Sequence, residues 1–129
     1  MIDPPSRQTP ANDLPRLQRQ AATAGCYVVA EMRALTPTAA RLRVTFAEAE
    51  SYIRETIRCL HLRDFVERVL MRNRWFDVYG CYRDKLGWYV KIGEDDDGLI
   101  VVSHHEPELL PLTTVAGAEI YATMLETGS

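Results

Sequence analysis

Three segments in the second half of the chain decide its fold: Trp75-Phe76-Asp77-Val78-Tyr79, Leu86-Gly87-Trp88-Tyr89-Val90-Lys91-Ile92 and Gly98-Leu99-Ile100-Val101-Val102-Ser103-His104-His105. They are rich in β-branched and aromatic residues, and polar residues alternate with apolar ones, as is typical of strands. Arg83-Asp84-Lys85 separates the first segment from the second, and Asp97-Gly98, which favours a hairpin turn, precedes the third. The sequence therefore predicts an antiparallel meander with strands over residues 75–82, 86–92 and 98–104.

The middle strand has two faces of different chemistry. Its apolar residues share one face, which we expect to lie in the core: Leu86, Trp88, Val90 and Ile92. Tyr89 and Lys91 share the other face, about 6.5–7 Å apart along the strand, so both can contact oxygens of one phosphate group. This face is either a site for phosphate chemistry or a solvated sheet surface.

Apolar residues at helical spacing predict most elements of the first half. Asp13 can cap a helix that Gly25 ends, and Thr45-x-x-Glu48 is a capping-box pattern. A weaker box, Asp64-x-x-Glu67, indicates one more helix. In chain order we expect a helix over 13–24, a strand or extended segment over 26–30, a helical turn over 36–42 and helices over 46–60 and 64–72.

Length and composition predict one domain. The chain has 129 residues, of which 47% are hydrophobic, enough for a single core. Residues 1–12 contain three prolines and little to bury, so we expect a flexible lead-in before a domain over 13–129. A final helix is predicted over 116–125, with a strand as the alternative. The fold class is thus α+β, with N-terminal helices packed on the sheet.

Composition also narrows location and chemistry. No apolar run approaches the roughly 20 residues of a membrane span and no signal peptide is recognisable, so we expect a cytoplasmic protein without membrane contact. The three cysteines form no CxxC pair, and no metal or cofactor site is predicted. The net charge of −3 disfavours general nucleic-acid binding, although basic residues concentrate between residues 54 and 91.

Several short motifs occur together in a characteristic order. Ala24-Gly25 follows the first helix, and Ile57-Arg58-Cys59-Leu60 precedes Asp64-Phe65. Trp75-x-Asp77-Val78-Tyr79, Tyr89-x-Lys91-Ile92 and Leu99-Ile100-Val101 with Ser103 then follow. In this order they resemble the MqsR family of mRNA interferase toxins from bacterial type II toxin–antitoxin modules, over nearly all of residues 14–105.

The resemblance implies a RelE-like fold, endoribonuclease activity and a cognate antitoxin as partner, with mRNA as substrate. The family tyrosine corresponds to Tyr89, and a family lysine near the end of the last strand corresponds to His105. Two family positions differ: Glu67 stands where the family has a lysine, and Phe76 stands where it has a glutamine. The family toxins also tend to be basic, whereas this chain is acidic.

RNA cleavage without a metal needs a base for the 2′-hydroxyl, a cation for the phosphate and an acid for the leaving oxygen. We expect catalytic roles for Tyr89, Lys91, His105 and Glu67, and RNA contacts from Arg68, Arg72, Arg83, Lys85 and His104. Lys91 or Arg83 would hold the phosphate. His105, with His104 in second place, can act as acid or base, and Glu67 can act as base. The alternatives are surface histidines and, for Glu67, a capping or solvent-facing carboxylate.

Three hypotheses follow. The first is a metal-independent endoribonuclease toxin that cleaves single-stranded mRNA. The second is a non-catalytic binding or regulatory protein of the same fold that has lost part of the active site. The third is a RelE-type nuclease that associates with the ribosome and cleaves only there.

Overall fold

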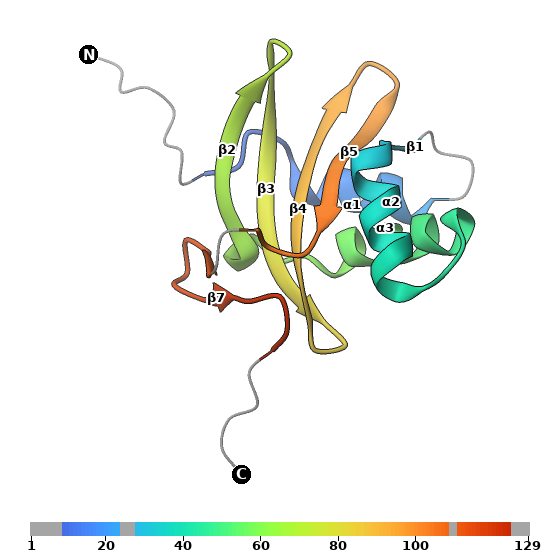
Figure 1. Cartoon of the computed structure of the whole chain (residues 1–129). Helices are drawn as coiled ribbons and strands as arrows, with labels where there is room; N and C mark the ends of the chain where they lie inside the picture. Colours follow the sequence, from blue (N-terminus) through green and yellow to red (C-terminus); the bar gives the residue numbers. More distant parts are fainter. Residues whose placement is uncertain (1–8, 24–27, 109–110, 125–129) are drawn as a thin grey trace.

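An α+β fold built on a five-stranded sheet is seen in the computed structural model, which describes residues 9–23, 28–108 and 111–124 (Figure 1). Four consecutive antiparallel strands make most of the sheet: β2 (Phe65–Met71), β3 (Arg74–Arg83), β4 (Leu86–Asp95) and β5 (Gly98–His105). The short β1 (Val28–Ala30) pairs with β5 in parallel, giving the order β1-β5-β4-β3-β2.

Tight turns join the first three of these strands. Arg72 and Asn73 connect β2 to β3, and Asp84 and Lys85 connect β3 to β4; all four have positive φ, between 51° and 70°. Two such residues in succession match the right-handed twist of adjacent strands, which is why this turn is common in hairpins. The meander is therefore set by local turn geometry.

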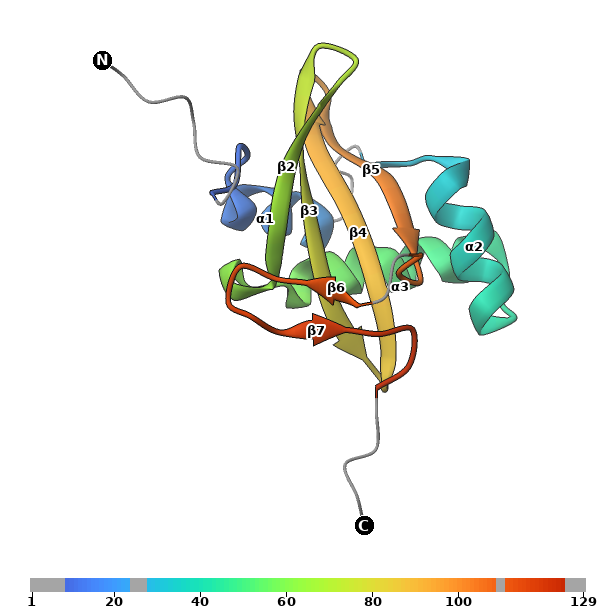
Figure 2. The ribbon, with the colours of Figure 1, turned by 60° about the vertical axis from the view of Figure 1, so that its left-hand side comes forward.

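Three helices cover one face of the sheet (Figures 1 and 2): α1 (Leu14–Ala22), α2 (Met32–Leu42) and α3 (Phe46–Cys59). The Thr45 side chain accepts from the Glu48 N–H, and the Glu48 carboxylate accepts from the Thr45 N–H, so the predicted capping box starts α3. A 3₁₀ turn, Leu62–Asp64, then leads into β2. The core between helices and sheet includes Leu17, Ile53, Ile57, Tyr79, Trp88, Val90, Ile92 and Leu99.

The C-terminal segment lies on the opposite face of the sheet. Its two short strands, β6 (Leu112–Thr113) and β7 (Glu119–Ile120), pair with each other and cross in front of β3 and β4 (Figure 2). This close approach requires glycine beneath it: a Cβ on Gly80 would lie 2.7 Å from the Leu112 side chain, and one on Gly87 only 1.7 Å from the Tyr121 carbonyl oxygen.

Most predicted elements are confirmed, and two are wrong. Residues 64–72 form strand β2 instead of a helix, and the expected helix over 116–125 is absent from its described part, where β7 realises the strand alternative. The turn predicted over 36–42 is the second half of α2, which starts at Met32 and contains Pro37. Of the strand predicted over 26–30, residues 26 and 27 lie outside the described residues.

Residues 9–12, part of the expected lead-in, contact the sheet. The backbone N–H groups of Ala11 and Asn12 donate to the buried Asp77 carboxylate at 2.8 Å each. Residues 1–8 lie outside the described part of the chain. Among the described helices, none is long and apolar enough to cross a membrane.

Candidate active site

Two rows of side chains cross the face of the sheet that the helices leave free. Strand pairing aligns Glu67, Val78, Lys91 and Ser103 in one row. In the next row, Tyr89 pairs with His105. All these residues line one cavity of about 370 Å³. The four residues expected to be catalytic, Glu67, Tyr89, Lys91 and His105, are therefore brought together from three strands.

An irregularity in β2 turns Glu67 toward this cavity. Phe65 pairs with Tyr79 and Glu67 pairs with Val78, so Val66 is an extra residue in the ladder. In a regular strand Phe65 and Glu67 would share a face. The bulge separates them: Phe65 is buried in the helix-side core, whereas Glu67 lines the cavity.

A second bulge, at Val102 in β5, changes which residues at the end of that strand face the cavity. Val101 pairs with Ile92 on the helix side, whereas Ser103 pairs with Lys91 on the cavity side. Simple alternation would put Val101, Ser103 and His105 on one face. The bulge thus places His105 in the cavity and turns His104 into the core.

Tyr89 and His105 stack, with ring centroids 4.9 Å apart and planes inclined by 10°. His105 Nδ1 lies 2.7 Å from the Glu106 carbonyl oxygen. Because a carbonyl only accepts, Nδ1 carries the proton, and in the neutral ring Nε2 is the proton acceptor. The Glu106 carbonyl thus favours the tautomer in which His105 Nε2 is free to accept a proton.

Burial shifts the pKa values of Lys91 and Tyr89, which line the cavity together. The pKa of Lys91 is lowered, first by burial and then by the positive charge of Arg33. The pKa of Tyr89 is raised, first by burial and then by the negative charge of Glu67. The ammonium, 5.8 Å from the Tyr89 ring, is therefore a stronger acid than an exposed lysine, and the phenol stays neutral and able to donate.

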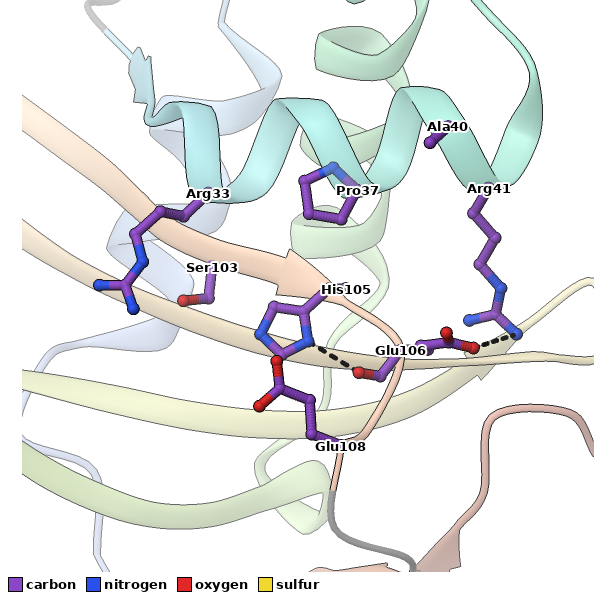
Figure 3. A pocket seen from close by; sticks show the side chains of 8 residues that line it. All are labelled: Arg33, Pro37, Ala40, Arg41, Ser103, His105, Glu106 and Glu108. Carbon is purple, nitrogen blue, oxygen red and sulfur yellow. Dashed lines mark hydrogen bonds and ion pairs between the residues drawn. The ribbon is translucent and has the colours of Figure 1, made fainter.

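The sequence does not predict Arg33, which also lines the cavity. Its side chain extends from α2 and lies beside Ser103 (Figure 3). With Ser103, His105 and Glu108 it also lines a second, adjacent cavity of about 650 Å³. Arg33 precedes the helical turn expected over 36–42, so no predicted element contained it; its position depends on packing of α2 against β5.

His104, expected to contact RNA, is fully buried on the helix side. Its ring stacks on Trp88, with centroids 4.3 Å apart, and its two nitrogens lie 2.7 Å from the Thr38 hydroxyl and 3.0 Å from the Thr56 hydroxyl. Burial lowers the pKa of His104 to about 3, so the ring is neutral at physiological pH. His104 belongs to the core and is therefore not available to contact RNA.

Arg83, the alternative phosphate clamp, is on the wrong face of the sheet. Its guanidinium lies 3.9 Å from the Tyr52 ring centroid and donates to the Tyr52 carbonyl and the Thr56 hydroxyl. These contacts attach the end of β3 to α3. Of these two expected cations, only Lys91 lines the cavity, and Arg83 has a structural role.

The other expected RNA contacts also lie apart from the cavity. Arg68 is on the helix side, where it donates to the Thr9 and Pro10 carbonyls. Arg72, in the β2–β3 turn, forms an ion pair with Glu31 at 2.8 Å. Lys85 is exposed in the β3–β4 turn. None of these residues lines the cavity around Tyr89.

A scan against protein-family models gave no match to this chain, and a search of curated proteins gave no significant match. The geometry of the cavity is therefore the basis for a functional proposal.

Proposed function

We propose that the protein is a metal-independent endoribonuclease that cleaves single-stranded RNA by attack of a 2′-hydroxyl. One observation carries the proposal: a single cavity is lined by an imidazole, an ammonium, a phenol and a carboxylate, from His105, Lys91, Tyr89 and Glu67. These are the group types that the reaction requires without a bound cofactor.

The cleavage step can be written with these residues. His105 Nε2 takes the proton of the 2′-hydroxyl while O2′ bonds to phosphorus. The bond from phosphorus to O5′ breaks, and the Lys91 ammonium gives O5′ its proton. The Tyr89 hydroxyl donates a hydrogen bond to a phosphoryl oxygen, where negative charge develops. The products are a 2′,3′-cyclic phosphate and a free 5′-hydroxyl.

Glu67 is the second proton acceptor of the cavity. It lies on the row of Lys91, two strands away across Val78. Its charge opposes the lowering of the Lys91 pKa. The base role of His105 is favoured because its proton-accepting nitrogen is fixed by the bond to Glu106.

The resemblance to MqsR toxins suggests a cellular role for this activity. We propose a RelE-like toxin of a type II toxin–antitoxin module that acts on mRNA in the cytoplasm and is neutralised by a cognate antitoxin. An adjacent antitoxin gene, and growth arrest on expression that the antitoxin relieves, are the expected observations. Expression without any growth effect would count against the toxin assignment.

The direct test is incubation of purified protein with single-stranded RNA in the presence of a chelator, with and without ribosomes. Cleavage without ribosomes is expected; it should be slower in Tyr89→Phe and lost in His105→Ala. Cleavage only with ribosomes would support the ribosome-dependent alternative. Intact RNA under both conditions would overturn the nuclease proposal.

A non-catalytic binding protein is the second candidate, and Phe76 favours it. Where the resembled family has a glutamine, Phe76 is 1% exposed and packs on Gly93, so it offers no polar group to RNA. This candidate predicts that Tyr89→Phe and Lys91→Ala leave the cellular phenotype unchanged. Loss of the phenotype in both folded variants would exclude it.

A further inference from the structure

The cavity that contains Tyr89 and Lys91 continues into the second cavity beside it. The two share four residues: Arg33, Ser103, His105 and Glu108. Beyond them, the second cavity follows the surface of α2, where Pro37, Ala40 and Arg41 line it (Figure 3). Its volume of about 650 Å³ lies in the range of small-molecule sites.

We propose that the second cavity binds a nucleoside next to the scissile bond and that Arg33 holds the phosphate between the two cavities. This inference rests on the proposed function. A strand that places one nucleoside in each cavity must pass its connecting phosphate over the residues that both share. His105, the proposed base, is among these residues, so the connecting phosphate is the one that reacts.

Arg33 has the charge and freedom that this role needs. Its side chain is exposed, and within the described ranges no carboxylate or carbonyl is bonded to it. Arg33 and Lys91 line the same cavity, and the positive charge of Arg33 contributes to the lowered pKa of Lys91. Together they can neutralise a phosphate on which negative charge increases in the transition state.

Arg41, the other arginine of the second cavity, is already engaged. It donates to the carbonyls of Gly87 and Ala122, and its guanidinium lies 4.9 Å from the Trp88 ring centroid. It also lies 4.0 Å from the Glu106 carboxylate. Arg41 therefore forms a wall and links the C-terminal segment to α2.

The remaining walls suit a nucleoside. Pro37 and Ala40 provide apolar surface against which a base can lie. The carboxylates of Glu106 and Glu108 can accept hydrogen bonds from N–H groups at a base edge. The cavity therefore offers both a face and an edge contact for one base.

The first test blocks the second cavity without touching the catalytic groups. Ala40 is exposed on α2, so Ala40→Trp fills the cavity at little cost to folding. On a random pool of single-stranded RNA, we expect base preference to change at one position beside the cleaved bond and KM to rise about tenfold, as for loss of one stacked base. The matched control is Ala47→Trp, an exposed position of α3 outside both cavities.

The second test measures Arg33 by binding alone. With a 2′-O-methyl RNA that cannot be cleaved, Arg33→Ala is expected to weaken binding and to lower the slope of log affinity against log salt by about 0.7, the value for one phosphate contact on a single strand. Arg19→Ala, an exposed arginine of α1, is the control.

The outcomes separate this inference from the proposed function. If the wild type cleaves RNA but Ala40→Trp and Arg33→Ala behave like their controls, the second cavity is not a subsite, although the nuclease stands. If the wild type binds the methylated RNA and cleaves nothing, but Arg33→Ala and Ala40→Trp both weaken this binding, the subsite stands and the nuclease falls.

Discussion

Tyr89 and His105 stack with their ring centroids 4.9 Å apart, because β4 and β5 pair these two residues directly. The stack fixes the imidazole plane, and the bond from Nδ1 to the Glu106 carbonyl fixes its proton. A loop histidine would need to be ordered by substrate. Here the sheet itself holds the proposed base in position.

Tyr89→Phe separates the two roles of this tyrosine. It keeps the ring that stacks on His105 and removes only the hydroxyl. We expect kcat on single-stranded RNA to fall about 10–100-fold with little change in KM, since the lost hydrogen bond forms with charge that develops in the transition state. Tyr121→Phe is the control, because its phenol bonds Glu119 outside the cavity. An equal effect of both variants would contradict the role of Tyr89.

The pH dependence of cleavage should report Lys91. The lysine acts protonated, so the rate falls as pH rises through its pKa, which burial and Arg33 hold below the ordinary 10.5. Arg33→Ala removes a like charge and should move this limb to higher pH. Glu67→Gln removes an opposite charge and should move it to lower pH. The pH–rate profile of each variant measures the shift; displacement of both in the same direction would contradict the assignment.

Stability should fall in acid because of His104. The folded state holds its pKa at about 3, below the ordinary 6.5, so between these values the unfolded chain binds more protons. The free energy of unfolding should therefore decrease as pH falls from about 6.5 toward 3, with a contribution of up to about 1.4 kcal/mol per pH unit.

Denaturant unfolding of His104→Gln tests this account. The variant should be less stable at pH 7 by about 1–3 kcal/mol, because it disturbs the bonds to Thr38 and Thr56, and its stability should depend less on pH. His61→Gln, at an exposed position, should match the wild type. A pH dependence that survives in His104→Gln would show that another group causes it.

Adding one methyl group to the sheet at Gly87 should loosen the packing of the C-terminal segment on β3 and β4. Gly87→Ala brings a Cβ against the Tyr121 carbonyl, which is backbone and cannot shift easily, whereas Gly80→Ala meets side-chain atoms of Leu112 and Ile120. Gly87→Ala should thus cost about 1–3 kcal/mol and speed amide exchange over residues 112–124. Gly80→Ala should do both to a smaller extent. Equal protection in the two variants would argue against this packing.

Local signals account for the part of the fold that the sequence predicts. The capping box of Thr45 and Glu48 starts α3, and alternation around Trp88 and Tyr89 gives the two faces of β4. These patterns act over a few residues and do not depend on distant contacts. The resulting α+β architecture is confirmed; the RelE-like assignment stays a proposal.

The sequence predicts a helix where strand β2 forms, because the apolar residues of so short a segment fit either period. Asp64 does cap, but it caps a 3₁₀ turn through the His61 N–H. Pairing with β3 then decides the conformation. The missed signal was Asn73, which tolerates the positive φ of the two-residue turn after β2.

The sequence places only part of the site on the correct face of the sheet. Tyr89 and Lys91 follow from alternation, whereas Glu67 and His105 depend on bulges at Val66 and Val102 that strict alternation cannot foresee. Resemblance to a family pointed to both positions. Arg33 carried no local signal, because only the packing of α2 brings it to the cavity.

Cleavage of a short single-stranded RNA in the presence of a chelator tests the proposed mechanism through the chemistry of the ends produced. Attack by the 2′-hydroxyl gives a 2′,3′-cyclic phosphate and a 5′-hydroxyl, and no cleavage when the nucleotide before the cleaved bond is 2′-deoxy. Cleavage of the 2′-deoxy substrate, or full activity of His105→Ala, would contradict it.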